Sequence, residues 1–237
     1  MDSKTRQKLK SDRFAQEVEH SFSWVGEHKD DIKRYGPIVL GVVIVALGIY
    51  YYVHYQANAR QEAYAHAYLI DTANVGPVPD KPGGLAYPTQ AAKDEARAKA
   101  FSELATKYSG TQEGAIAQMY MASDAADKGN MANAEKLYAS VVDSAPKAIA
   151  AQARMSLADV YIAEGKTADA EKALRYAIAN PTVTVSKDEA TIHLAQLMIK
   201  DHCDEARKML MPLRTGPSAT ISQAAVAALG QTATCSN

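Results

Sequence analysis

The chain has 237 residues, 47% apolar and 7% aromatic, which excludes a globally disordered chain, and its two cysteines exclude a disulfide-dense scaffold. Its 26 Lys and Arg balance 27 Asp and Glu, which excludes the basic surface of a nucleic-acid-binding protein. Alanine accounts for 44 residues and has the highest helix propensity, whereas sheets favour β-branched and aromatic residues, so composition predicts an all-α protein.

The first 34 residues form a segment with apolar side chains at helical spacing. Phe14, Val18, Phe22 and Val25 fall on one face of a predicted helix. This amphipathic helix has two interpretations. It lies on the inner leaflet of a membrane, helped by the Lys and Arg residues between positions 4 and 13, or it docks on a membrane partner. The sequence favours neither.

Residues 35–56 have the length and composition of a transmembrane helix. The core of this segment, residues 38–53, contains sixteen residues without a charge, and such a helix is roughly 24 Å long. With Tyr35 and Tyr55 added, it reaches the roughly 30 Å of a hydrocarbon core. Gly36-Pro37 is predicted to open the helix, since proline is favoured in a first turn. A buried core helix is the alternative, but no other segment is apolar enough to surround it.

Basic residues are distributed unequally around the predicted span. Eight Lys and Arg precede it, whereas the twenty residues after it contain only Arg60. The positive-inside rule therefore predicts a cytoplasmic N-terminus and an exported C-terminal part, which in a bacterium is periplasmic. The competing interpretation is a signal peptide cleaved after Ala59, in the sequence Ala57-Asn58-Ala59. The long segment before the span and the helical pattern that continues through Ala57 favour an uncleaved anchor.

Residues 57–237 are predicted to form a helical repeat domain. A helix at 57–70 and a helix at 91–108 make a first pair, separated by a Pro- and Gly-rich insertion at 72–89. Beyond it, small and large apolar residues recur every 36 positions, a pattern typical of tetratricopeptide repeats, in which small residues let paired helices approach. The three series are Ala134, Ala170 and Ala206; Tyr138, Leu174 and Leu210; and Ala122, Ala158 and Leu194.

Three repeat units follow from this period, at residues 115–148, 151–181 and 186–213, with a last helix near 218–230. Gly129 and Gly165 mark the turns of the first two units. The third unit has no glycine in its turn, and Met211-Pro212 interrupts its second helix. Ser186 and Glu189 form a capping box at its start. We therefore expect a tetratricopeptide-like α-solenoid of about four helical pairs.

Four segments carry a resemblance to a known family. They are EHKDDIKRYG at the end of the N-terminal segment, the span PIVLGVVIVALG, the helix QANARQEAYAHAY and the repeat GAIAQMYMASDAADKGNMANAEKLYASVVDSAP. In these segments and in their order the chain resembles the ancillary subunits of the SecYEG translocon, bacterial inner-membrane proteins with a periplasmic tetratricopeptide-like domain. The resemblance implies an accessory role at the Sec translocon, with exported polypeptides and a periplasmic chaperone as partners.

Binding residues are expected on the concave face, which the first helix of each pair forms. In repeat register this face carries a methionine in each helix, and methionine suits adaptable recognition of apolar segments. The alternative is that several of these residues are simply core. The predicted positions are Met119, Ser123, Gln152, Met155, Asp159, Thr191 and Met198, together with Ile116 and Ala195.

The sequence contains no spacing typical of an active site. Its six histidines form no HExxH motif, and neither a phosphate-binding loop nor a G-x-S-x-G motif is present. We therefore expect no catalysis, cofactor, metal or small-molecule substrate. Cys203 and Cys235 would lie in an oxidising compartment if exported. They form either a disulfide that closes a loop of about 30 residues or two free thiols.

The predicted function is that of a non-enzymatic interaction protein with one membrane anchor. The leading hypothesis is an accessory subunit of the Sec translocon that links it to periplasmic chaperones during protein export. The alternative is a periplasmic chaperone or scaffold for envelope assembly that does not bind the translocon. Both use protein partners, and the two differ only in which proteins are bound.

Overall fold

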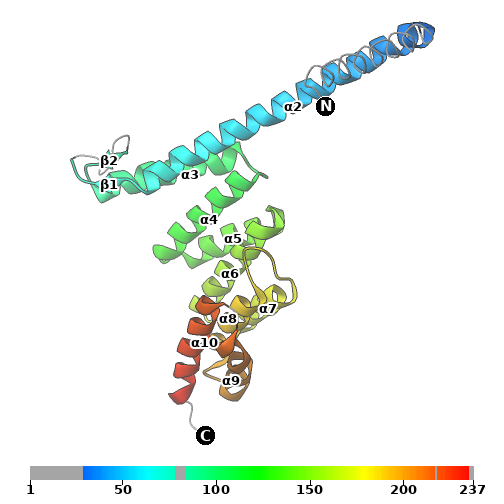
Figure 1. Ribbon diagram of the computed structural model, residues 1–237. Coiled ribbons are helices and arrows are strands. Elements are labelled where there is room, and N and C mark those ends of the chain that lie inside the picture. Colours follow the sequence, from blue (N-terminus) through cyan, green and yellow to red (C-terminus); the bar gives the residue numbers. More distant parts are fainter. Residues whose placement is uncertain (1–28, 78–83, 217, 235–237) are drawn as a thin grey trace, which may run out of the picture. The chain divides into compact units, whose positions relative to one another are not determined.

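The computed structural model describes residues 29–77, 84–216 and 218–234, and this part of the chain is predominantly helical (Figure 1). It contains the helices α2 to α10, two short 3-10 helices and two short strands. The all-α prediction is therefore confirmed. The predicted amphipathic helix of residues 14–25 lies outside the described residues. The chain divides into two compact units, Met1–Ala59 and Arg60–Asn237.

Helix α2, Lys29–Asp71, includes the whole predicted span and continues to the end of the predicted helix at 57–70. One expectation was wrong: Gly36-Pro37 does not open the helix, because α2 begins eight residues before Pro37. A proline inside a helix removes one backbone hydrogen bond. Helices that cross membranes tolerate this loss, because local adjustment of the backbone satisfies the freed carbonyl.

The apolar side chains of residues 38–53, the predicted span within α2, are all exposed in this structure. The most apolar window of the helix has a mean hydropathy of 2.1, and none of it is buried. Ile38, Ile44 and Leu47 are each about 60% exposed. The helix is long and apolar enough to cross a membrane. Signal sequences meet the same criteria.

The insertion at 72–89 is closed at its base by a small sheet, where the sequence indicated only a loop. Strands β1, Asn74–Val75, and β2, Ala86–Tyr87, pair in parallel. Helix α3, Gln90–Lys107, follows at once, and the Thr89 side chain caps it by accepting a hydrogen bond from the Ala92 N–H. Threonine is a favoured N-cap residue because its hydroxyl satisfies an otherwise unpaired N–H.

The remaining helices form the three predicted repeats and the predicted last helix, and each packs against the next (Figure 1). The first pair of the three is α4, Gln112–Asp127, and α5, Met131–Ser144. The second is α6, Lys147–Ala163, and α7, Thr167–Ala179. The third is α8, Lys187–Met198, and α9, Cys203–Leu210, followed by the 3-10 helix η1, Met211–Thr215; α10 is Ala219–Gln231, and the 3-10 helix η2 is Thr232–Thr234.

Turn and cap residues explain where these helices begin and end. Gly129 and Gly165 have φ of 75° and 73°, a left-handed conformation that favours glycine, as the sequence indicated for these turns. The Ser186–Glu189 capping box at the start of α8 is confirmed. Helix α9 ends at Leu210, and Pro212 lies inside the 3-10 helix η1, so the predicted interruption is confirmed.

The residues of the 36-residue period form the core of the repeat domain. Ala122, Ala134, Ala158, Ala170 and Ala206 are fully buried. The large apolar residues of the same period are also buried, with Leu174, Leu194 and Leu210 at 0% exposure and Tyr138 at 6%. Since alanine leaves the backbones of two helices close together, the period in the sequence predicted the helix contacts themselves.

Candidate protein-binding surfaces

The methionines predicted on the concave face point mainly into the core. Met155 and Met198 are 7% and 6% exposed and belong to one hydrophobic cluster, and Ala195 is fully buried beside them. Met119 and Ile116 are half-buried and pack against the neighbouring cluster. The burial of Met155, Met198 and Ala195 agrees with the interpretation as core. A partner-binding role for Met119, Met155 and Met198 stays a prediction.

The polar residues predicted on that face are accessible. Ser123, Gln152 and Asp159 are exposed, and Thr191 is half-buried, with its hydroxyl donating a 2.8 Å hydrogen bond to the Lys187 carbonyl. A partner-binding role for these four residues stays a prediction.

A contact between a histidine and a carboxylate joins α8 to α6, and it becomes an ion pair when the histidine is protonated. The Nδ1 atom of His193 on α8 lies 3.7 Å from the Asp159 carboxylate on α6. Interaction with Asp159 raises the pKa of His193 above its ordinary value, although partial burial acts in the opposite direction. The imidazole is therefore more readily protonated in the folded domain than in an unfolded chain.

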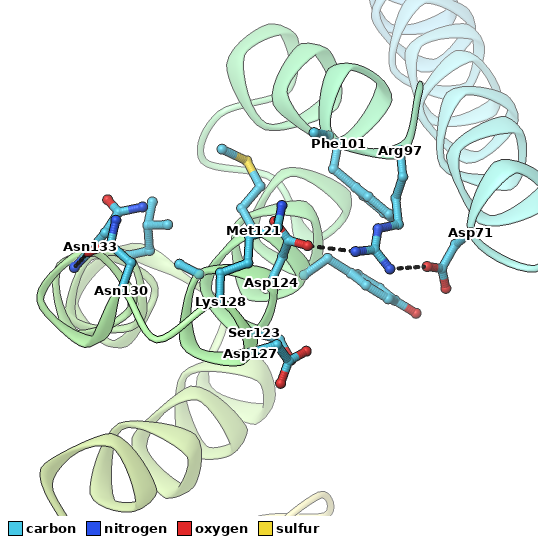
Figure 2. A pocket seen from close by; sticks show the side chains of 14 residues that line it. Asp71, Arg97, Phe101, Met121, Ser123, Asp124, Asp127, Lys128, Asn130 and Asn133 are labelled. Carbon is cyan, nitrogen blue, oxygen red and sulfur yellow. Dashed lines mark hydrogen bonds and ion pairs between the residues drawn. The ribbon is translucent and has the colours of Figure 1, made fainter. Parts of the chain in front are cut away.

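A pocket of about 420 Å³ lies between α3, α4 and α5, next to the end of α2 (Figure 2). Sequence reasoning did not find it, because its lining comes from four helices, at positions that the 36-residue period does not single out. Ser123 alone among the predicted concave residues lines it. The pocket has a charged side around Arg97 and, across from it, a side formed by α5 (Figure 2).

Arg97 of α3 holds the charged side together. Its guanidinium lies 2.5 Å from the Asp124 carboxylate on α4 and 3.6 Å from that of Asp71 at the end of α2. Lys128 also pairs with Asp124, at 2.6 Å. Burial by itself would raise the pKa of Asp124, but Lys128 and Arg97 hold it below its ordinary value. Asp124 therefore stays charged at neutral pH, and each of its two carboxylate oxygens already has a cationic partner, Arg97 or Lys128.

Aromatic stacking forms the wall beside this cluster. The rings of Phe101 on α3 and Tyr120 on α4 lie 4.4 Å apart and within 10° of parallel. Phe101 is only 2% exposed. Burial, with repulsion from Tyr64 and Asp71, raises the pKa of Tyr120, so its phenol stays neutral. The stacked rings give the pocket a largely aromatic wall.

The opposite side is formed by α5. Asn130 caps that helix by accepting a 3.3 Å hydrogen bond from the Asn133 N–H, and Leu137 lies one turn further on. Met121 of α4 lies between this side and the arginine in Figure 2. The pocket thus combines an apolar centre with exposed amide and charged groups at its mouth.

Cys203 opens α9, and its sulfur is disulfide-bonded. The sulfur lies 3.9 Å from the Thr232 carbonyl oxygen, close to the segment that leads to Cys235. Cys235 lies outside the described residues, so the Cys203–Cys235 bridge stays a prediction. Within the described part of the chain, no group of His, Cys, Asp and Glu side chains has the arrangement of a metal site.

Helical pairs stacked with a constant period define the class of helical-repeat proteins, whose members typically bind other proteins and carry no active site. The family model described as tetratricopeptide repeat-like domain matches residues 29–180, and the chain belongs to this family. The match begins at the first residue of α2, so it includes the apolar helix, and it ends directly after α7. No curated protein and no solved structure matches the chain.

Proposed function

We propose that this protein is a non-enzymatic adaptor held in the bacterial inner membrane by residues 35–56 of α2. Residues 1–34 lie in the cytoplasm, and the repeat domain of residues 57–237 binds proteins in the periplasm. The observation that carries this proposal is the apolar stretch of α2, none of which is buried, in a chain of a family that binds proteins. The basic residues before the span support the orientation.

The partners that we propose are the subunits of the Sec translocon, a periplasmic chaperone and the exported polypeptides themselves. The support is the resemblance of the four segments and of their order to the ancillary translocon subunits. A scaffold for envelope assembly that does not bind the translocon would have the same architecture. The two functions are therefore distinguished by the partners and not by the fold.

Crosslinking of intact membranes, followed by purification of the full chain in mild detergent, tests the partners. We expect translocon subunits among the crosslinked proteins. A crosslinked set of envelope-assembly proteins without translocon subunits would instead establish the scaffold. A variant without residues 1–34 serves as the companion. If it retains its partners, binding resides in the repeat domain, and loss of partners with retained membrane insertion assigns binding to the N-terminal segment.

A reporter fused after Asn237 tests the orientation. We expect activity from a reporter that functions only in the periplasm and none from one that functions only in the cytoplasm. The reverse pattern would contradict the proposed topology. An uncleaved anchor further predicts that the mature protein keeps the residues before Ala59, which N-terminal sequencing of the purified protein determines directly.

A further inference from the structure

The pocket between α3, α4 and α5 presents one uncompensated charge to a ligand, and this charge is negative. Three carboxylates and two cations line the pocket. Arg97 is engaged by Asp71 and Asp124, and Lys128 is engaged by Asp124. Asp127, which is exposed in the last turn of α4, forms no ion pair with any residue that the structure describes. The negative end of the helix dipole adds to the attraction of a cation at this position.

The centre of the pocket is suited to an apolar side chain. Met121 and Leu137 are half-buried there, and the buried ring of Phe101 lines the same pocket. Methionine adapts its shape to different apolar groups. A volume of about 420 Å³ also lies within the range of pockets that enclose a ligand, roughly 300–1,000 Å³. An apolar group can therefore be buried beside a charged one.

The α5 side adds groups that match a peptide backbone. The side-chain amide of Asn133 is exposed and makes no hydrogen bond within the described part of the chain, and Asn130 uses only its oxygen, for the helix cap. A carboxamide both donates and accepts hydrogen bonds, as a peptide group does. These amides and Asp127 all line the pocket; in Figure 2 the amides lie on the α5 side and Asp127 lies beside Ser123 of α4.

We propose that this pocket binds an extended segment of a partner protein in which a large aliphatic side chain lies next to a lysine or arginine. The aliphatic group packs on Met121 and Leu137, the cation pairs with Asp127, and the backbone pairs with Asn133. An acidic segment would meet Asp127 and two cations that are already neutralised. This inference rests on the proposed function as an interaction protein and specifies the chemistry of its partner.

Fluorescence anisotropy with the purified full chain in detergent tests the inference. The probes are labelled Ser/Gly decapeptides that carry Leu-Lys, Leu-Glu or Gly-Lys at the centre, measured at low ionic strength. We expect Leu-Lys to bind most tightly. Because exposed ion pairs are weak, the preference for Leu-Lys over Leu-Glu is expected to be roughly two- to fivefold. No binding by any probe, or equal binding of Leu-Lys and Leu-Glu, would overturn the proposal.

Substitutions at exposed positions separate the pocket from the rest of the surface. Asp127→Lys should invert the preference between Leu-Lys and Leu-Glu, while the matched change Asp143→Lys, on an exposed residue of α5 outside the pocket, should leave it unchanged. Met121→Ala should weaken both leucine probes, and Met211→Ala should not. Equal effects of the two aspartate variants would overturn the proposal. Because these probes contain no translocon protein, this failure would leave the crosslinking result untouched.

Discussion

The apolar stretch of α2 and helix α6 are built from similar residues and have opposite surroundings. Helix α6 buries eight of its residues, including Ile149 at 6% exposure, whereas Ile38 and Ile44 of α2 are about 60% exposed. The difference lies in the distribution of polar residues, because α6 carries Gln152 and Asp159 on an exposed side, while residues 38–53 have no charged residue on any side. A helix that is apolar on all sides is stable only where its whole circumference is covered. Protein covers α6, and the exposed circumference of residues 38–53 supports the proposal that lipid covers this part of α2.

Charges in the centre of the span should have the largest effect. In the variant Ile44→Arg/Leu47→Arg, each arginine costs about 2.5–3.5 kcal/mol at the centre of a membrane helix. We expect the protein to leave the membrane fraction on carbonate extraction. The control Ile162→Arg, on a 41% exposed residue of α6, should stay in the membrane. Retention of the double variant would contradict a transmembrane role for α2.

A cavity in the repeat core should reduce stability by a smaller amount. Leu174 is fully buried, with 0% of its surface exposed to solvent. Replacing such a leucine by alanine costs about 2–5 kcal/mol of stability. Denaturation of the full chain in detergent, followed by circular dichroism, should show this loss for Leu174→Ala. The matched variant Ile162→Ala should lose much less. Equal losses would mean that α6 and α7 do not pack as described.

The predicted bridge between Cys203 and Cys235 should contribute to the stability of the repeat domain. A disulfide that closes a loop of about 30 residues contributes about 3 kcal/mol in the chain-entropy model. Cys203→Ser should therefore lower the stability by about this amount, and Cys203→Ser/Cys235→Ser should lower it no further. Two titratable thiols in the denatured, unreduced protein would show that the bridge does not form.

Overfilling a helix contact should cost about 1–3 kcal/mol. Ala170 on α7 is fully buried where two helices meet, while Ala168 on the same helix is exposed. Ala170→Leu should lower the midpoint of denaturation, and Ala168→Leu should leave it nearly unchanged. A similar response of both variants would contradict the conclusion that the alanines recurring every 36 positions lie at close helix contacts.

The smallest effect concerns pH. Since the pKa of His193 is raised in the folded domain, its stabilising pair with Asp159 is fully present below the ordinary histidine value of about 6.5 and is lost as pH rises through the raised value. Both side chains are partly exposed, so the contribution is about 0.2–1 kcal/mol. The denaturation midpoint should fall between pH 5.5 and 8.5 by more in the unmodified protein than in His193→Gln.

Much of the repeat domain was predictable, because the signals were local or periodic. Gly129 and Gly165 marked turns, Ser186 and Glu189 marked a helix start, and the alanine series marked contacts. The start of α2 was not predictable from the sequence, because proline occurs both at the start of helices and inside helices that cross membranes. The pairing of β1 with β2 was also missed, since two-residue strands leave no period in a sequence.

The candidate binding residues were likewise predictable only in part. Helical spacing placed Ser123, Gln152 and Asp159 on an exposed surface correctly, but it gave the same direction to Met155 and Met198, which are buried. In a stacked pair one helix face meets both its partner and the next repeat, so a period alone does not separate core from surface. The boundary depends on how far each neighbouring helix covers that face.

The sequence by itself determined the all-helical class, the repeat period and the uncharged span, because each depends on the order of residue types along one chain segment. Only the tertiary structure decided that Arg97 would meet Asp71 and Asp124, and that Asp127 would be left without a partner among the described residues. These groups come from separate helices, and their distances are set by helix packing. The pocket between α3, α4 and α5 exists for the same reason.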